Sequence, residues 1–284
     1  AVSTETKWIG GIADRSWFNA PQYAPYRQPG NVKVPCWLQP DRHYAGVAWY
    51  QRAIEIPAAW SGQRVVLTLE RPHWETRVWM DGQLVGTNNS LSTPHVYALG
   101  LVAGDGATPP RPDGLGSGRL QPGKHTLTIR VDNRMVVDVG ENSHSVTDHT
   151  QGNWNGIVGA LTLSSTPPVW IDDVQVYPDA AAKTARVKVR IGNATGEEGR
   201  GRFRVSGVGC QDGGAAMDVT WDAAGGEAEL NVAFKPDTPT WDEFDPALVT
   251  LNLPLTPDTR HPTPDARDAR VGLRTLSTTG THFA

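Results

Sequence analysis

Apolar and polar residues alternate along most of this sequence, in short runs bounded by glycine, proline, asparagine and aspartate. A period of two is typical of a strand with one buried and one solvated face, whereas the period of roughly 3.6 that marks an amphipathic helix is almost absent. In Thr76–Met80, for example, Val78 and Met80 share one face while Arg77 and Trp79 share the other. The pattern therefore predicts an all-β protein built of sandwiches.

Proline divides the strand candidates into two groups. Ser164–Pro168 contains two consecutive prolines, which lack the N–H that a strand ladder needs. The candidates before it are Ala48–Ile56, Arg64–Leu69, Thr76–Met80, His125–Val131 and Gly159–Leu163. Those after it are Val169–Tyr177, Thr184–Ile191, Arg200–Val205, Met217–Trp221, Glu227–Phe234, Ala247–Leu253 and Ala269–Leu276. About seven short strands in the second group favour an immunoglobulin-like sandwich.

The domain division follows from this break. We expect a first β-sandwich over residues 1–166, whose first forty residues form an irregular arm, and a second over 167–276. Residues 277–284 are expected to begin a connection to something further. Asp81-Gly82 supplies the positive-φ positions of a tight hairpin, and Gly100–Gly118 is expected to be a surface loop.

Charge and composition exclude some partners. The 284 residues carry 26 basic and 30 acidic side chains, a formal net charge of -4, without a run of like charge. Bulk electrostatic binding to nucleic acid or to an anionic membrane is therefore not expected, and no apolar run approaches the roughly 20 residues of a spanning helix. The two cysteines, Cys36 and Cys210, fall in different predicted domains and are expected to be buried free thiols rather than a bridge.

Seven sequence blocks occur in a fixed order, and together they carry a family resemblance. They read YAGVAWYQR at 44–52, LER at 69–71, VWMDG at 78–82, LQPGKHTLTIRVDN at 120–133, NWNGIVG at 153–159, WDEFDPAL at 241–248 and VGLRT at 271–275. They resemble blocks of the sugar-binding jelly roll and the immunoglobulin-like domain of glycoside hydrolase family 2. The resemblance covers nearly all of residues 40–284 and implies a galactose-binding-like jelly roll followed by an immunoglobulin-like sandwich.

The same resemblance implies a (β/α)8 barrel that carries two catalytic glutamates, about 5–5.5 Å apart for retention of configuration. Such a barrel occupies roughly 250 residues beyond those present here. No residue of this chain is therefore expected to be catalytic, and no cofactor is expected. Glu197-Glu198 and Asp172-Asp173 are interpreted as solvated loop charges. The implied parent is a retaining exo-β-glycosidase, with galactoside, glucuronide, mannoside and galactofuranoside all open as substrates.

Two polar stretches are candidates for contact with sugar, because sugar recognition needs planar hydrogen-bonding groups beside aromatic faces. The first is the loop Asn88–His95, in which Asn89, Ser90, Thr93 and His95 are the candidates, although asparagine and serine are also ordinary turn residues. The second precedes the last strand of the jelly roll, where the resemblance points to the substrate pocket. Its candidates are Asp148, His149, Gln151, Asn153, Trp154 and Asn155, with Trp154 open to a second interpretation as a core anchor.

A metal site is not expected. His144, Asp148 and His149 lack a cysteine or a fourth donor for zinc, and a hard cation held by aspartate and carbonyl oxygens is the better of the two metal interpretations. Most of the remaining tryptophans are expected to pack between sheets, although one or two exposed rings would suffice for sugar stacking.

Three functions remain open from the sequence. The first is the ancillary part of a glycosidase, whose partners would be a β-glycoside and the catalytic barrel of the same parent chain, with a homo-oligomer also possible. The last residues, 275–284, resemble a strand that runs on into a further structure, which favours this hypothesis. The second is a free-standing carbohydrate-binding module without enzymatic activity, and the third is a structural spacer. A periplasmic or secreted location is slightly favoured, and the redox compartment stays open.

Overall fold

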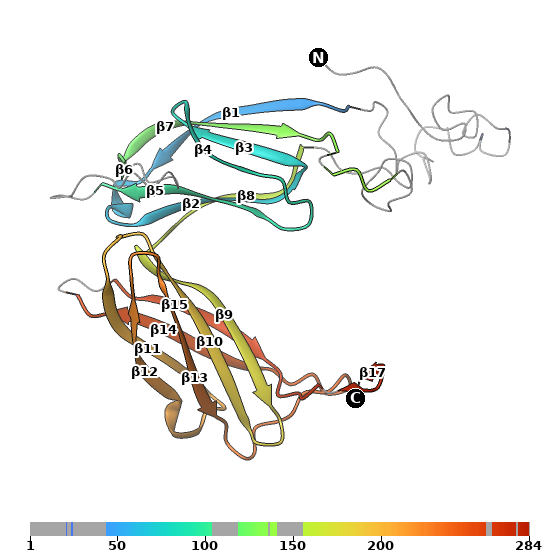
Figure 1. Cartoon of the computed structure of the whole chain (residues 1–284), viewed down its shortest axis with the longest axis vertical. Helices are drawn as coiled ribbons and strands as arrows, with labels where there is room; N and C mark the ends of the chain where they lie inside the picture. Colours follow the sequence, from blue (N-terminus) through green and yellow to red (C-terminus); the bar gives the residue numbers. More distant parts are fainter. Residues whose placement is uncertain are drawn as a thin grey trace.

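The fold is known from a computed structural model, which describes residues 21, 24, 44–103, 119–135, 137–140, 156–259, 263–276 and 278–283. Strands dominate these residues, and the helical segments among them are single 3-10 turns such as Ala58–Trp60 and Gln211–Gly213. The predicted all-β sandwich fold is thereby confirmed (Figure 1). None of the helical segments in the described ranges has the length and apolarity to cross a membrane.

The first sandwich consists of two four-stranded sheets (Figure 1). One has the order β1-β7-β3-β4 and the other the order β6-β5-β2-β8. Their strands are β1 (Val47–Ile56), β2 (Arg64–His73), β3 (Glu75–Met80), β4 (Gln83–Asn88), β5 (His95–Val102), β6 (Arg119–Leu120), β7 (Gly123–Asp132) and β8 (Gly156–Thr166). All their pairings are antiparallel except the short parallel pair β5–β6. Strands distant in sequence therefore lie side by side, as in β1 and β7.

The second sandwich packs a three-stranded sheet, β13-β10-β9, against a four-stranded sheet, β12-β11-β14-β15. This arrangement of seven antiparallel strands is immunoglobulin-like. The strands are β9 (Val169–Asp179), β10 (Thr184–Asn193), β11 (Gly199–Gly207), β12 (Ala215–Trp221), β13 (Gly226–Ala233), β14 (Val249–Pro257) and β15 (Asp265–Val271). A small hairpin of β16 (Thr278–Thr279) and β17 (His282–Phe283) follows.

Each sandwich has its own core, built from alternate residues of facing strands. In the first, Leu67 and Leu69 of β2 face Val78 of β3 and Ile129 of β7. In the second, Val187, Val189 and Ile191 of β10 are buried while the basic side chains between them are exposed. The period of two in the sequence thus predicts the buried face correctly in both sandwiches.

Several local predictions are confirmed and some are wrong. Asp81 and Gly82 both have positive φ, 48° and 82°, as the tight hairpin between β3 and β4 requires. The last strand of the second sandwich was expected at Ala269–Leu276 but runs over Asp265–Val271, and the strand expected at Ala247–Leu253 runs over Val249–Pro257. Register with β14 explains the first error, because Asp265 pairs with Leu255 and Val271 with Val249.

The C-terminal residues also differ from expectation. Residues 278–283 turn back on themselves through Gly280, which has a φ of 63°, so that β16 pairs with β17. The strand expected to run on from residue 275 is therefore a hairpin. Cys210 is a buried free thiol, as expected, and Cys36 lies outside the described residues.

The two sandwiches meet at the proline break. Thr166 at the end of β8 pairs with Arg64, whereas Val169 at the start of β9 pairs with Asn193, so only two prolines separate the two ladders. The Arg64 guanidinium lies over the Trp170 ring, 4.0 Å from its centroid. The division at residues 166 and 167 stays our proposal for the domain boundary.

Candidate functional site

One end of the first sandwich gathers the described candidate residues. The loop between β4 and β5 carries Asn89, Ser90 and Thr93, and β5 begins at His95. The start of β3, the end of β7 and the start of β8 lie at the same end of the sandwich (Figure 1). The candidates Asp148, His149, Gln151, Asn153, Trp154 and Asn155 lie outside the described residues, immediately before β8.

His95 is buried and fully occupied by protein partners. Its Nε2 lies 2.7 Å from the Ser90 carbonyl oxygen, and since a carbonyl only accepts, Nε2 carries the proton. Its Nδ1, 2.6 Å from Thr76 Oγ1, then accepts from that hydroxyl, while burial lowers the pKa of His95 and keeps the ring neutral. With both nitrogens bonded, this ring positions the loop rather than offering a group to a ligand.

The hydrogen bonds of His95 continue into the sheet. The Tyr97 hydroxyl lies 2.5 Å from Thr76 Oγ1 and 3.1 Å from the Thr76 carbonyl oxygen. Burial raises the pKa of Tyr97, so this hydroxyl keeps its proton and donates it to Thr76. Thr76, His95 and Tyr97 therefore form a buried polar chain that joins β3 to β5 beneath the loop.

The other loop candidates have side chains at or near the surface. Asn89 is exposed, and its carbonyl oxygen accepts a 2.7 Å hydrogen bond from Nε1 of the buried Trp74. Thr93 is exposed and donates to Ser90 Oγ at 2.7 Å, and the Ser90 backbone N–H donates to Asn88 Oδ1. The backbone of the loop is thus fixed from inside, which leaves the Asn89 amide and the Thr93 hydroxyl near solvent.

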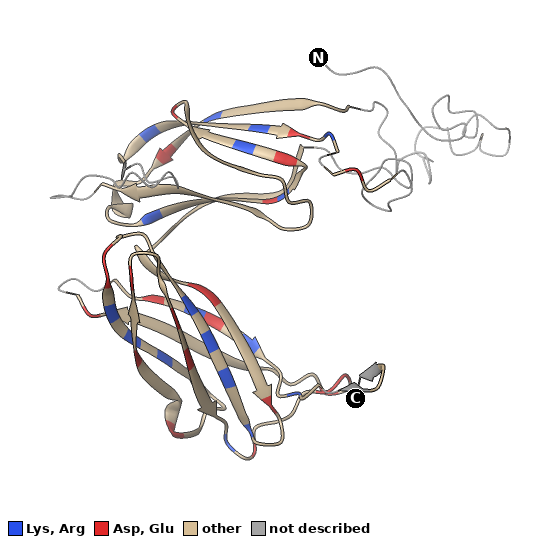
Figure 2. Cartoon of the chain, viewed as in Figure 1, with Lys and Arg blue, Asp and Glu red and all other residues tan. Residues whose placement is uncertain are grey.

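Charged side chains form a connected cluster beside this loop, at the ends of β3 and β7 (Figure 2). Arg130 bridges the two carboxylates, 2.9 Å from Glu75 and 2.7 Å from Asp132. Arg134 binds Asp132 through both Nε and Nη2. The hydrogen bond from Arg134, followed by the backbone N–H of Arg134 and the nearby charges, outweighs burial and lowers the pKa of Asp132 to about 2.

Sequence reasoning did not single out this cluster. Its signal was present in the alternation, because Glu75 and Arg77 share a face of β3 and Arg130 and Asp132 share a face of β7. The register that pairs Arg77 with Arg130 and Glu75 with Asp132 was needed to bring them together.

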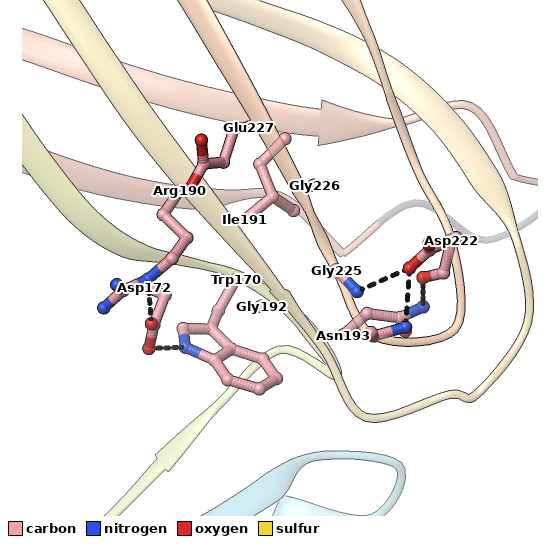
Figure 3. A pocket seen from close by; sticks show the side chains of 11 residues that line it. Trp170, Asp172, Arg190, Ile191, Gly192, Asn193, Asp222, Gly225, Gly226 and Glu227 are labelled. Atoms are coloured by element: carbon pink, nitrogen blue, oxygen red, sulfur yellow. Dashed lines mark hydrogen bonds and ion pairs between the residues drawn. The ribbon is translucent and has the colours of Figure 1, made fainter.

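A pocket of about 410 Å³ lies in the second sandwich, among β9, β10 and the turn between β12 and β13 (Figure 3). Its polar groups bind one another. Asp172 accepts from Trp170 Nε1 and from Arg190 Nε, and Asn193 Nδ2 donates to the Asp222 carbonyl oxygen (Figure 3). Trp170 is covered by Gly192 on one side, where an added Cβ would lie 2.2 Å from the ring, and by Arg64. The pocket therefore has no open aromatic face to offer a sugar.

Among the described residues, no group of three or more histidine, cysteine, aspartate or glutamate side chains is placed to hold a metal ion. The pair expected to be solvated at Glu197-Glu198 is exposed, whereas Asp172 is engaged with Arg190.

Comparison with known proteins relates the chain to glycosidases. No family model matches it. The curated β-glucuronidase of the pig, Sus scrofa, is 25% identical over 259 residues, which are 85% of this chain but 37% of that protein. The chain thus spans little more than a third of the curated relative it matches.

Solved structures of glycosidases are similar to this chain in fold, again over a limited part of their own length. A family 2 β-galacturonidase from Eisenbergiella tayi has a TM-score of 0.63 at 18% identity, over 85% of this chain and 37% of its own. A putative β-galactosidase from Bacteroides fragilis has a TM-score of 0.64 at 18% identity, over 87% of this chain and 36% of its own. A β-glucuronidase from Bifidobacterium dentium has a TM-score of 0.57 at 20% identity, over 85% of this chain and 42% of its own. The chain is therefore similar in sequence and in fold to a limited part of glycoside hydrolases of family 2, which confirms the resemblance carried by its sequence blocks.

Proposed function

We propose that this chain is the non-catalytic part of a retaining exo-β-glycosidase of family 2, which supports a catalytic barrel and contributes loops to sugar recognition. The observation that carries the proposal is the unequal coverage: a match over 85% of this chain accounts for only 37% of the pig β-glucuronidase. The remaining part of such a protein is where the barrel and its paired glutamates would lie.

The chemistry of the described carboxylates supports the assignment of a non-catalytic role. A glycosidase acid needs a raised pKa so that it is protonated at working pH. Asp132, the most enclosed carboxylate of the charged cluster, has instead a pKa of about 2 and two arginine partners. It is ionised at neutral pH and binds Arg134 just after the end of β7, which is a structural task.

Sugar recognition is assigned to the end of the first sandwich. Asn89 and Thr93 offer an amide and a hydroxyl near solvent, and Ser90 Oγ accepts a hydrogen bond from the Thr93 hydroxyl. Asp148, His149, Gln151, Asn153, Trp154 and Asn155 complete the proposed set, as residues just ahead of β8. His95 is assigned to positioning the loop.

The test is hydrolysis by the protein encoded by the complete reading frame. We expect it to cleave a p-nitrophenyl β-D-glycoside, with the glucuronide and galactoside assayed first, and the 284-residue chain alone to cleave none. Asn89→Ala with Thr93→Ala should raise KM and leave kcat nearly unchanged, because uniform binding is lost. Thr220→Val, on the exposed face of β12, is the matched control.

Two outcomes would overturn the proposal. A reading frame that ends at Ala284, together with sugar binding and no hydrolysis, would leave the free-standing carbohydrate-binding module as the function. A KM unchanged in the double variant, in an active protein, would remove the loop from the recognition site.

A further inference from the structure

The outer face of the sheet β1-β7-β3-β4 carries two tryptophans that meet across a strand. Trp49 on β1 is 62% exposed, and Trp79 on β3 is half-buried. Their ring centroids are 5.3 Å apart and their planes are tilted by 34°. Since β1 and β3 are separated by β7, their backbones are about 10 Å apart, so the two side chains lean toward each other over β7.

The pair is not part of the core. Val78 and Met80 of β3 point into the sandwich and are buried, so Trp79, between them, lies on the opposite face. Trp49 pairs in register with Arg130 and belongs to that same face, whereas the core cluster contains neither tryptophan. A pair of tryptophans outside the core is a candidate for a binding surface, because aromatic residues are enriched among the residues that dominate binding energy.

Hydrogen-bonding side chains flank the rings. Gln51 and Thr128 lie opposite each other on the same face, with Gln51 Nε2 donating to Thr128 Oγ1 at 3.1 Å. Thr128 is also the register partner of Trp79. Amides and hydroxyls beside aromatic faces are the groups that bind a pyranose, whose ring has apolar C–H faces and a polar rim.

At the end of this face, two of the three basic groups of the charged cluster point outward. The side chains of Arg77 and Arg134 are 46% and 63% exposed, whereas their partners Glu75 and Asp132 are 22% and 11% exposed. Arg130 lies between the two carboxylates, so the cluster contains three guanidiniums and two carboxylates. An approaching ligand therefore meets guanidinium N–H groups, which bind a carboxylate in a planar, bidentate manner.

We propose that this outer face is a binding platform for an oligosaccharide of uronic acid units, with sugar rings on Trp49 and Trp79 and a carboxylate on Arg77 or Arg134. The chain of sugars would lie along β3 and β7 toward the end of the sandwich where the polar loop is found. The platform needs no catalytic domain, so it stands or falls independently of the function proposed above.

Titration of the 284-residue chain with a galacturonate hexamer tests the platform, followed by calorimetry and tryptophan fluorescence. We expect saturable binding with a change in emission, and a loss of affinity of about tenfold or more in Trp49→Ala. Trp49→Phe should retain most of the affinity, because it keeps an aromatic face. Arg77→Gln should weaken binding of the hexamer more than that of a neutral glucose hexamer.

Phe244→Ala is the control, because Phe244 is an even more exposed aromatic residue, 91% accessible, in the second sandwich. Absence of hexamer binding at millimolar concentration would overturn the proposal, as would equal affinity in Trp49→Ala and in the unmodified chain. Binding that is unchanged both in Arg77→Gln and in Arg134→Gln would overturn the assignment of the carboxylate. Failure of the complete protein to hydrolyse glycosides would contradict only the function proposed earlier.

Discussion

Arg64 on β2 and Trp170 on β9 join the two sandwiches, with the guanidinium 4.0 Å from the centroid of the indole ring. Burial lowers the pKa of Arg64, against the opposing charge of Asp172, yet the group stays charged at any ordinary pH. A cation over an indole face is a favourable contact, and partial desolvation strengthens it.

A double-mutant cycle measures this contact. Arg64→Ala and Trp170→Leu, singly and together, should give a coupling of about 1 kcal/mol in the free energy of unfolding. Denaturation in urea, followed by circular dichroism, is the measurement. Arg202→Ala, which removes an exposed pair with Asp218, is expected to change stability by less than about 1 kcal/mol. A coupling near zero would show that the two side chains do not stabilise each other.

His125 is expected to stabilise the β3–β4 hairpin in acid. Although burial opposes protonation, its hydrogen bonds to Asp81 Oδ2, at 2.6 Å, and to the Gln121 carbonyl raise its pKa above 6.5. A raised pKa in the folded state gives stability that is complete below about pH 6.5 and is lost as the pH rises through the folded value.

Thermal melts of the unmodified chain and of His125→Gln at several pH values test this prediction. The difference in melting temperature should be largest near pH 6 and should shrink toward pH 8. A difference that is constant with pH would mean that the Asp81 contact is insensitive to the charge of the ring.

Asp132→Asn should destabilise the chain by at most about 2 kcal/mol at neutral pH, because a pKa of about 2 rather than 3.8 corresponds to that free energy before solvent screening reduces it. The lowered pKa means that this stability is present above about pH 4 and is lost as the pH falls toward 2. Urea denaturation at pH 7 and pH 3 should show the two proteins converging in acid. Asp218→Asn, at an exposed pair, supplies the comparison and should change little at either pH.

Thr76→Val should cost about 1–3 kcal/mol, because it leaves His95 Nδ1 and the Tyr97 hydroxyl without their common partner. Since the pKa of His95 is lowered, the folded chain resists protonation and loses stability as the pH falls below 6.5, opposite in sign to His125. Amide hydrogen exchange of residues 88–95 should also accelerate. Unchanged exchange in a folded Thr76→Val chain would contradict the positioning role of His95.

Alternation in the sequence predicts most strands because burial on one face is a local property. It places Val78 and Met80 inward and Trp79 outward without any knowledge of neighbours. It does not predict that Trp49 meets Trp79, since that contact depends on the register of β1 and β3 with β7. The charged cluster at the ends of β3 and β7 was not predicted for the same reason, because it depends on the register of those two strands.

Errors at strand ends have another cause. Arg267, Asp268 and Arg270 of β15 are exposed, so the start of this edge strand shows little apolar alternation, whereas Leu273 is buried beyond its end. Leu273 is held instead by Trp241, because the backbone N–H of Trp241 donates a hydrogen bond to the Leu273 carbonyl oxygen. In the sequence, an apolar residue buried by a loop looks the same as one buried in a sheet, so Leu273 was assigned to the strand. For the loop Asn88–His95, the sequence indicated polarity but not that His95 would be enclosed.

The passage from β8 to β9 has a consequence for motion. The rings of Pro167 and Pro168 fix their φ angles, and the Pro168 carbonyl accepts a hydrogen bond from the Ala194 N–H, so the connection is restrained. With Arg64 on Trp170 as a second restraint, the two sandwiches are expected to share one rotational diffusion time. A ligand bound to the first sandwich would then keep one fixed orientation relative to the second sandwich.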